Sequence, residues 1–95
     1  MKVHQKGYLL LALNQSGSLW DYELIKKTLH EYNESGAFRE KTLSIALDEL
    51  AAAGLISRIE EKLETVGDQL KLRFRYKLSD FGVSRMVDTG LLLAW

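Results

Sequence analysis

The sequence predicts a mostly helical α+β domain in which three helices precede a two-stranded β ribbon and one short helix follows it. Three observations support this fold class. Apolar residues recur at helical spacing through the first half of the chain, apolar and charged residues alternate strictly between positions 70 and 78, and a second helical pattern follows position 79. With 95 residues, the chain fits one small domain covering residues 1–95.

The composition excludes several classes of protein. The chain has no cysteine, so it forms neither disulfides nor thiolate zinc sites, and His4 and His30 have no partner at metal-ligand spacing. Its longest apolar runs are far shorter than the roughly 18 residues that a membrane span needs. Neither a G-x-S-x-G nucleophile motif nor a phosphate-binding glycine loop is present. We therefore expect a soluble cytoplasmic protein that is not an enzyme, holds no cofactor or metal and does not bind membranes.

The first expected helix spans about residues 3–14, and its apolar residues are too dense for a single face. We therefore expect a central helix that is covered on most sides. A polar turn at residues 14–18 separates it from a second helix, expected from residue 20 or 21 to residue 32. We expect Trp20, at the start of this helix, to be a core anchor that packs it on the ribbon.

A third helix is expected from residue 38 or 39 to residue 53, after a polar connection. Gly54 should end it, because glycine readily adopts the left-handed conformation at a helix C-terminus. Its apolar face consists of Leu43, Ala46, Leu47 and Leu50. Asp48 and Glu49 lie on the other side, so residues 39–56 carry a net charge of minus one, with two basic and three acidic residues.

Residues 57–79 form the expected ribbon and hold the only positive segment, with six basic and four acidic residues. If Gly67 and Asp68 make a two-residue turn, Leu63 pairs with Leu72 on the apolar face. In this register the remaining apolar pair is Ile59 with Tyr76. The charged face then consists of the pairs Glu64–Lys71, Lys62–Arg73, Glu60–Arg75 and Arg58–Lys77.

That register places six cations and two anions on one face of the ribbon. Its misfit is Glu61, which lies opposite Phe74, and we expect a β-bulge or a longer loop around Val66 to relieve it. Rows of charge on exposed strands are often only solvated faces that block pairing at the sheet edge.

The last helix is expected over about residues 80–93, with Ser79 as its N-cap. It carries more apolar surface than a core of this size can bury. We expect part of it to form a homodimer interface made by Met86, Leu91, Leu92, Leu93 and Trp95.

Three helices, a glycine, a two-stranded ribbon and a last helix are the order of a winged helix-turn-helix domain. Three stretches carry a closer resemblance. They read WDYEL at residues 20–24, TLSIALDEL with GLI at residues 42–50 and 54–56, and RYKLSDFG at residues 75–82. With these stretches the chain resembles the PadR-type transcriptional regulators and, more loosely, the MarR type.

The resemblance implies a homodimer that binds double-stranded DNA, with the third helix in the major groove and the ribbon, or wing, on the backbone or minor groove. The residues that it assigns to base edges are Arg39, Lys41, Thr42, Ser44 and Ile45. Those that it assigns to phosphates are Lys62, Lys71, Arg73 and Arg75. Some members of that family hold planar aromatic effectors between their C-terminal helices. The resemblance therefore makes Trp95, Leu92 and Met86 candidates for a small aromatic effector site. The alternatives for Trp95 are a dry dimer contact or a frayed chain end.

The chain also departs from the family pattern. Ser44 and Ile45 replace a common Tyr and Pro, and Asp48 and Glu49 replace basic residues. Two carboxylates there would repel phosphate and confine DNA contact to the N-terminal turn of the helix and the wing. The alternative function is therefore a winged-helix module that binds protein and not DNA, through the Asp48–Glu49 side or through residues 91–95.

Overall fold

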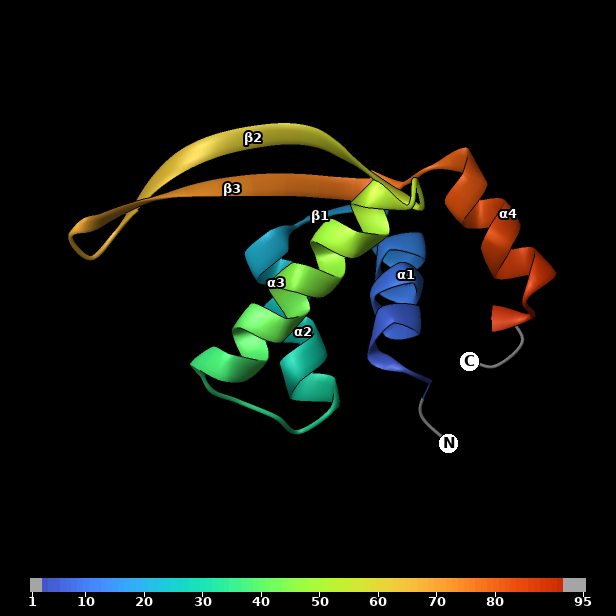
Figure 1. Ribbon diagram of the computed structural model, residues 1–95, viewed down its shortest axis with the longest axis horizontal. Coiled ribbons are helices and arrows are strands. Elements are labelled where there is room, and N and C mark those ends of the chain that lie inside the picture. The colour runs from blue at the N-terminus through green and yellow to red at the C-terminus, as the bar shows by residue number, and fades with distance from the viewer. Residues whose placement is uncertain (1–2, 92–95) are drawn as a thin grey trace.

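In the computed structural model, which describes residues 3–91, the chain forms four helices and a three-stranded antiparallel sheet (Figure 1). The elements are α1 (Gln5–Ser16), β1 (Ser18–Trp20), α2 (Asp21–Glu31), α3 (Ala37–Ala52), β2 (Ile56–Val66), β3 (Gln69–Leu78) and α4 (Asp80–Asp88). The mostly helical α+β class is confirmed. No helix in residues 3–91 is long and apolar enough to cross a membrane.

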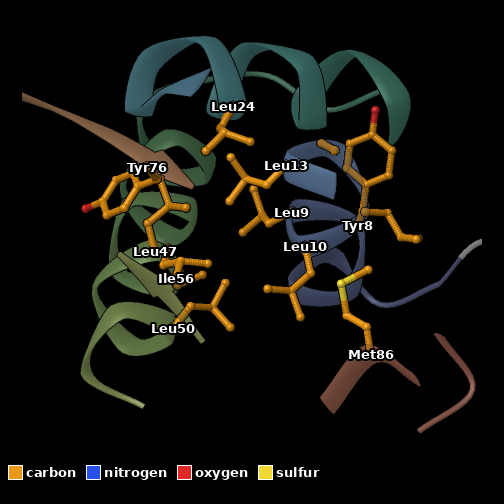
Figure 2. Close-up of a cluster of buried hydrophobic side chains, with 13 residues drawn as sticks. Tyr8, Leu9, Leu10, Leu13, Leu24, Leu47, Leu50, Ile56, Tyr76 and Met86 are labelled. Atoms are coloured by element: carbon orange, nitrogen blue, oxygen red, sulfur yellow. The ribbon is translucent and has the colours of Figure 1, made fainter. Parts of the chain in front are cut away.

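Helix α1 lies at the centre of the fold. Six consecutive side chains, from Tyr8 to Leu13, are buried, as their density in the sequence predicts. Figure 2 shows Leu9, Leu10 and Leu13 pointing toward the side chains of α2, α3 and α4, among them Leu24, Leu47 and Met86. The helix begins and ends two residues later than expected. At its start the His4 side chain accepts a hydrogen bond from the backbone N–H of Lys6, and at its end Gly17 is the C-cap, with its N–H donating to the carbonyl of Leu13.

The sheet contains a strand that the sequence did not reveal. The three residues of β1 pair antiparallel with β3, which lies between β1 and β2, so the expected two-stranded ribbon is wrong and the sheet has three strands. Leu19 pairs with Tyr76, which is almost completely buried, so this side of the sheet faces the core. All four helices lie on that side, and the β2–β3 ribbon extends well past them (Figure 1).

The ribbon register is as predicted near its tip and wrong near its base. Leu63 pairs with Leu72, and the charged pairs from Glu64–Lys71 to Glu60–Arg75 are confirmed. The bulge, however, lies between Arg58 and Glu60 and not around Val66. Arg58 therefore pairs with Tyr76, Lys77 pairs with Ser57, and Ile59 has no partner in the ladder.

A tight junction joins the end of α3 to the start of α4. Gly54 has a φ of 79° and ends α3, as its position predicts. The backbone N–H of Ser79 donates to the carbonyl of Leu55, and the Ser79 hydroxyl accepts from the N–H of Gly82. Helix α4 is shorter than expected: it ends at Asp88, ahead of the left-handed Gly90.

Candidate nucleic-acid interface

A groove of about 990 Å³ runs between α2, α3 and β3. Helix α3 contributes Lys41 and Ser44 to its lining, and β3 contributes Lys71 and Arg73. Four of the nine residues that the sequence assigned to DNA contact therefore meet at one concave surface. Two cations from the sheet and one from the helix line the same groove.

Acidic side chains also line this groove, and two of them are already engaged. Strand β1 ends at Trp20, so the edge of β3 beyond Arg75 has no partner strand. Asp21 takes the place of a strand there, because one of its carboxylate oxygens accepts from the backbone N–H of Phe74 at 3.2 Å. The other Asp21 oxygen accepts from the N–H of Tyr22 at 2.7 Å. Glu34 accepts from Gln5 at 2.6 Å and lies 3.8 Å from Arg39.

The two carboxylates late on α3 each have a basic partner. Asp48 lies 2.7 Å from a guanidinium nitrogen of Arg58, and Glu49 lies 3.3 Å from the ammonium of Lys6. The bulge before Glu60 turns Arg58 to the core side of the sheet, toward Asp48 on α3. Each carboxylate thus has its own counter-charge, which the sequence does not reveal because neither basic partner is near in sequence.

The remaining α3 candidates lie outside the groove. Thr42 and Ile45 face the start of α1 across a smaller pocket of about 230 Å³, and the Thr42 hydroxyl donates to the carbonyl of Phe38. Ile45 is about half exposed. Arg39 lies near Glu34 and within 5.7 Å of the Phe38 ring.

We call the sheet surface that faces away from the helices the outer face. The register places Lys62, Lys71, Arg73, Arg75 and Lys77 on it, with Glu60 and Glu64 as its anions. The expected row of six cations therefore becomes five, since the bulge removes Arg58. Arg75 contacts Glu60 at 3.2 Å, and both Lys62 and Arg73 lie 3.5 Å from Glu64.

Two aromatic residues border this face. Trp20 is partly exposed and is not the expected core anchor; its ring is nearly parallel to that of Tyr22, at 14° and 6.4 Å between centroids. The Lys62 ammonium lies 4.3 Å from the Trp20 ring centroid and donates to the Tyr22 hydroxyl at 3.1 Å. This hydrogen bond raises the pKa of Lys62. The Arg73 guanidinium lies over the Tyr22 ring at 5.0 Å.

The residues expected at a dimer interface are only partly described. Met86 is buried in the chain's own core, with 1% of its surface exposed, and is therefore not available to a partner. Leu91 is half-buried and approaches Gly7 of α1. Leu92, Leu93 and Trp95, and with them most of the expected effector site, lie outside the described residues. The exposed apolar side chains of α4 are Phe81, Val83 and Val87.

No protein-family model matches the chain, and no curated protein sequence matches it significantly. Within residues 3–91, no group of three His, Asp or Glu side chains is placed to hold a metal ion.

Proposed function

We propose that the protein is a winged-helix regulator of the PadR-like type that binds double-stranded DNA, with α3 in the major groove and the β2–β3 ribbon as its wing. The order of the elements, with α3 followed directly by a long ribbon, is compatible with a winged helix. The observation that carries the proposal is the shared groove. Lys41 and Ser44 on α3 line it together with Lys71 and Arg73 on β3.

This groove suits the sugar-phosphate backbone at one side of the major groove. The major groove is about 12 Å wide and admits a helix, so the flanking strand of a duplex that takes α3 passes between the helix and the wing. There, Lys and Arg neutralise phosphate oxygens and the Ser44 hydroxyl donates a hydrogen bond. Arg39, on the first turn of α3, is expected to leave Glu34 and bond a guanine edge.

The acidic end of α3 weakens this proposal less than the sequence suggests. Because Asp48 and Glu49 are paired with Arg58 and Lys6, a phosphate near them meets neutral pairs instead of isolated carboxylates. Exposed ion pairs of this kind contribute little to stability, but they do reduce the local negative potential. Contact is still expected to concentrate on the N-terminal half of α3 and on the wing.

A salt titration of duplex binding tests the proposal. We expect log affinity to fall linearly with log salt concentration, and the Lys71→Ala, Arg73→Ala double variant should reduce the slope by about 1.8, since each phosphate contact contributes about 0.9. The Lys27→Ala, Arg85→Ala variant removes the same charge on other surfaces and should keep the wild-type slope. Absence of duplex binding at low salt would refute the proposal.

The regulator is proposed to act as a homodimer through α4 and the residues that follow it. Val83 and Val87 lie one turn apart on the exposed side of α4, next to Phe81. A two-fold dimer predicts a pseudo-palindromic site whose half-sites are about one helical turn apart. Light scattering should show a dimer for the wild type and a monomer for Val87→Asp. A monomeric wild type would remove this part of the proposal.

One observation favours a second candidate function, a module that binds protein. Leu63, Leu70 and Leu72 on the core-side face of the ribbon are 69%, 70% and 50% exposed. Large exposed apolar groups on a projecting ribbon are typical of protein contact surfaces. In that case neither duplex binding nor a salt-dependent slope should appear, whereas Leu70→Asp should abolish the contact with the protein partner.

A further inference from the structure

The outer face of the sheet combines positive charge with two partly exposed rings. The helices lie mainly on the opposite side of the sheet (Figure 1), and the first turn of α2 reaches the edge of the outer face through Tyr22, whose hydroxyl accepts from Lys62. Strand β3 places a cation at every second residue from Lys71 to Lys77, which at about 3.4 Å per residue gives a row about 20 Å long. The row is long enough to follow several phosphates of an extended strand.

Trp20 and Tyr22 provide a surface for stacking beside this row. Their rings are within 14° of parallel, and the Lys62 ammonium lies over both, 4.3 Å from the centroid of Trp20 and 5.3 Å from that of Tyr22. Lys62 therefore approaches both rings, and the Arg73 guanidinium lies over Tyr22 at 5.0 Å. The two rings form what we call the aromatic platform, defined by Trp20 and Tyr22.

We propose that the outer face binds single-stranded nucleic acid, with an unpaired base stacked on the aromatic platform and the flanking phosphates on Lys62, Arg73 and Arg75. Proteins that bind single strands combine a positive track for the backbone with aromatic rings for the bases. In a duplex the bases are already stacked and paired, so only an unpaired base can use such rings. This proposal goes beyond duplex binding and is tested separately from it, although Tyr22 and Arg73 also line the α3 groove.

Lys62 and Glu64 close the platform when no strand is bound. The Lys62 side chain is 39% exposed and its ammonium occupies the place above the rings that a base would take. Glu64 lies 3.5 Å from both Lys62 and Arg73, which is where a phosphate between these two cations would lie. On binding, the base displaces the ammonium from the rings and a phosphate displaces the Glu64 carboxylate. Both displaced contacts are partly exposed, and such contacts are weak.

Tryptophan fluorescence tests the proposal without changing the platform. The chain has two tryptophans, so the Trp95→Phe variant leaves Trp20 as the only one. Titration of this variant with oligo(dT) of about 12 nucleotides, within the ~4–16 nucleotide site size of single-strand domains, should quench its emission. Inorganic polyphosphate supplies charge without bases and should compete for the site but not quench Trp20. Equal quenching by polyphosphate, or none by oligo(dT) at low salt, would overturn the proposal.

Affinity measurements with a labelled oligo(dT) assign the roles of the individual residues. Trp20→Leu should weaken binding by about 5- to 150-fold, the effect of removing one stacked base, while Trp20→Phe should retain most of the affinity. Glu64→Gln should raise the affinity several-fold, because it removes the competing carboxylate. The control Phe38→Ala removes an exposed ring from α3 and should leave oligo(dT) binding unchanged. Unchanged affinity in both Trp20→Leu and Glu64→Gln would refute the site.

The duplex and single-strand sites are separable in the same assay. Lys41→Ala with Ser44→Ala should weaken duplex binding and leave oligo(dT) binding intact, whereas Glu64→Gln should strengthen oligo(dT) binding most. If both variants changed the two affinities in parallel, a single nonspecific cationic surface would explain all binding, and the single-strand site would be rejected. Oligo(U) at equal length, if bound more tightly than oligo(dT), would support the site and identify the strand as RNA.

Discussion

Replacing Gly82 by alanine should disrupt the junction that holds α4 and the base of the ribbon together. A β-carbon at Gly82 would lie 2.1 Å from the carbonyl oxygen of Leu55 and 3.0 Å from its carbonyl carbon. The backbone conformation at Gly82 is open to any residue, so the close approach is the only obstacle. The atoms that would clash belong to the backbone, which cannot move away as a flexible side chain can.

The expected loss of stability follows from this distance. β-Carbons in proteins keep at least 3.0 Å from such atoms, so α4 and Leu55 would have to separate by about 0.9 Å. That movement strains two of the hydrogen bonds of Ser79. Its N–H donates to the carbonyl of Leu55, and its hydroxyl accepts from the N–H of Gly82. Overpacking of this kind costs about 1–3 kcal/mol, and two hydrogen bonds contribute about 1 kcal/mol each. Alanine recovers up to about 1 kcal/mol through its helix propensity, which leaves a net loss of about 2–4 kcal/mol.

Urea unfolding followed by circular dichroism measures this effect. With a slope of about 1–2 kcal/mol per molar urea, the unfolding midpoint of Gly82→Ala should fall by about 1–4 M. Gly7→Ala is the matched control, because its β-carbon would lie 3.3 Å from a terminal carbon of the flexible Leu91 side chain. Gly7 is inside α1, so this variant should be neutral or up to about 1 kcal/mol more stable. A Gly82→Ala midpoint equal to that of the wild type would show that α4 does not begin against Leu55.

Two further predictions concern the base of the ribbon. Burial raises the pKa of the Tyr76 hydroxyl, so the unfolded chain loses this proton first as the pH rises, and stability should fall once the pH passes the unfolded value of about 10. Tyr76→Phe loses the hydrogen bond from Arg58, so its free energy of unfolding at pH 7 should be about 1–3 kcal/mol lower than that of the wild type. Between pH 7 and 10.5, however, urea unfolding should show a smaller decrease in stability for this variant than for the wild type. Deleting Ile59 should change the free energy of unfolding by less than about 1 kcal/mol, because this half-exposed residue has no partner in the ladder. The deletion should nevertheless straighten the ribbon and weaken duplex binding several-fold. A deletion that unfolds the chain would show that the bulge is needed for the fold itself.

The sequence predicts the elements whose patterns are long. Six consecutive apolar residues in α1 indicate an element that is covered on most sides, and α1 is indeed buried along this run. Nine strictly alternating residues in β3 predict both the strand and the set of cations that share its outer face. In β3 the alternation repeats often enough to exclude a helix.

Short elements and long-range pairs are not predictable in this way. Strand β1 has three residues, too few for an alternating pattern, and only its pairing with β3 makes it a strand. The aromatic platform depends on this pairing, because it places Trp20 beside Arg75 on the outer face. The cationic partners of Asp48 and Glu49 are equally hidden from the sequence, since they come from β2 and α1.

The bulge shows how one extra residue in a strand changes the electrostatics of the candidate site. The sequence shows a misfit at Glu61, opposite Phe74, and a bulge near the tip would relieve it. The ladder instead keeps that pair and inserts the extra residue at Ile59, so Arg58 reaches the core side, where it lies 4.1 Å from the Phe74 ring and donates to Tyr76. These contacts and the ion pair with Asp48 exist only on that side. The inserted residue thus removes the Arg58 cation from the outer face and brings it to the Asp48 carboxylate on α3. This pairing reduces the repulsion between α3 and phosphate that the sequence alone predicts.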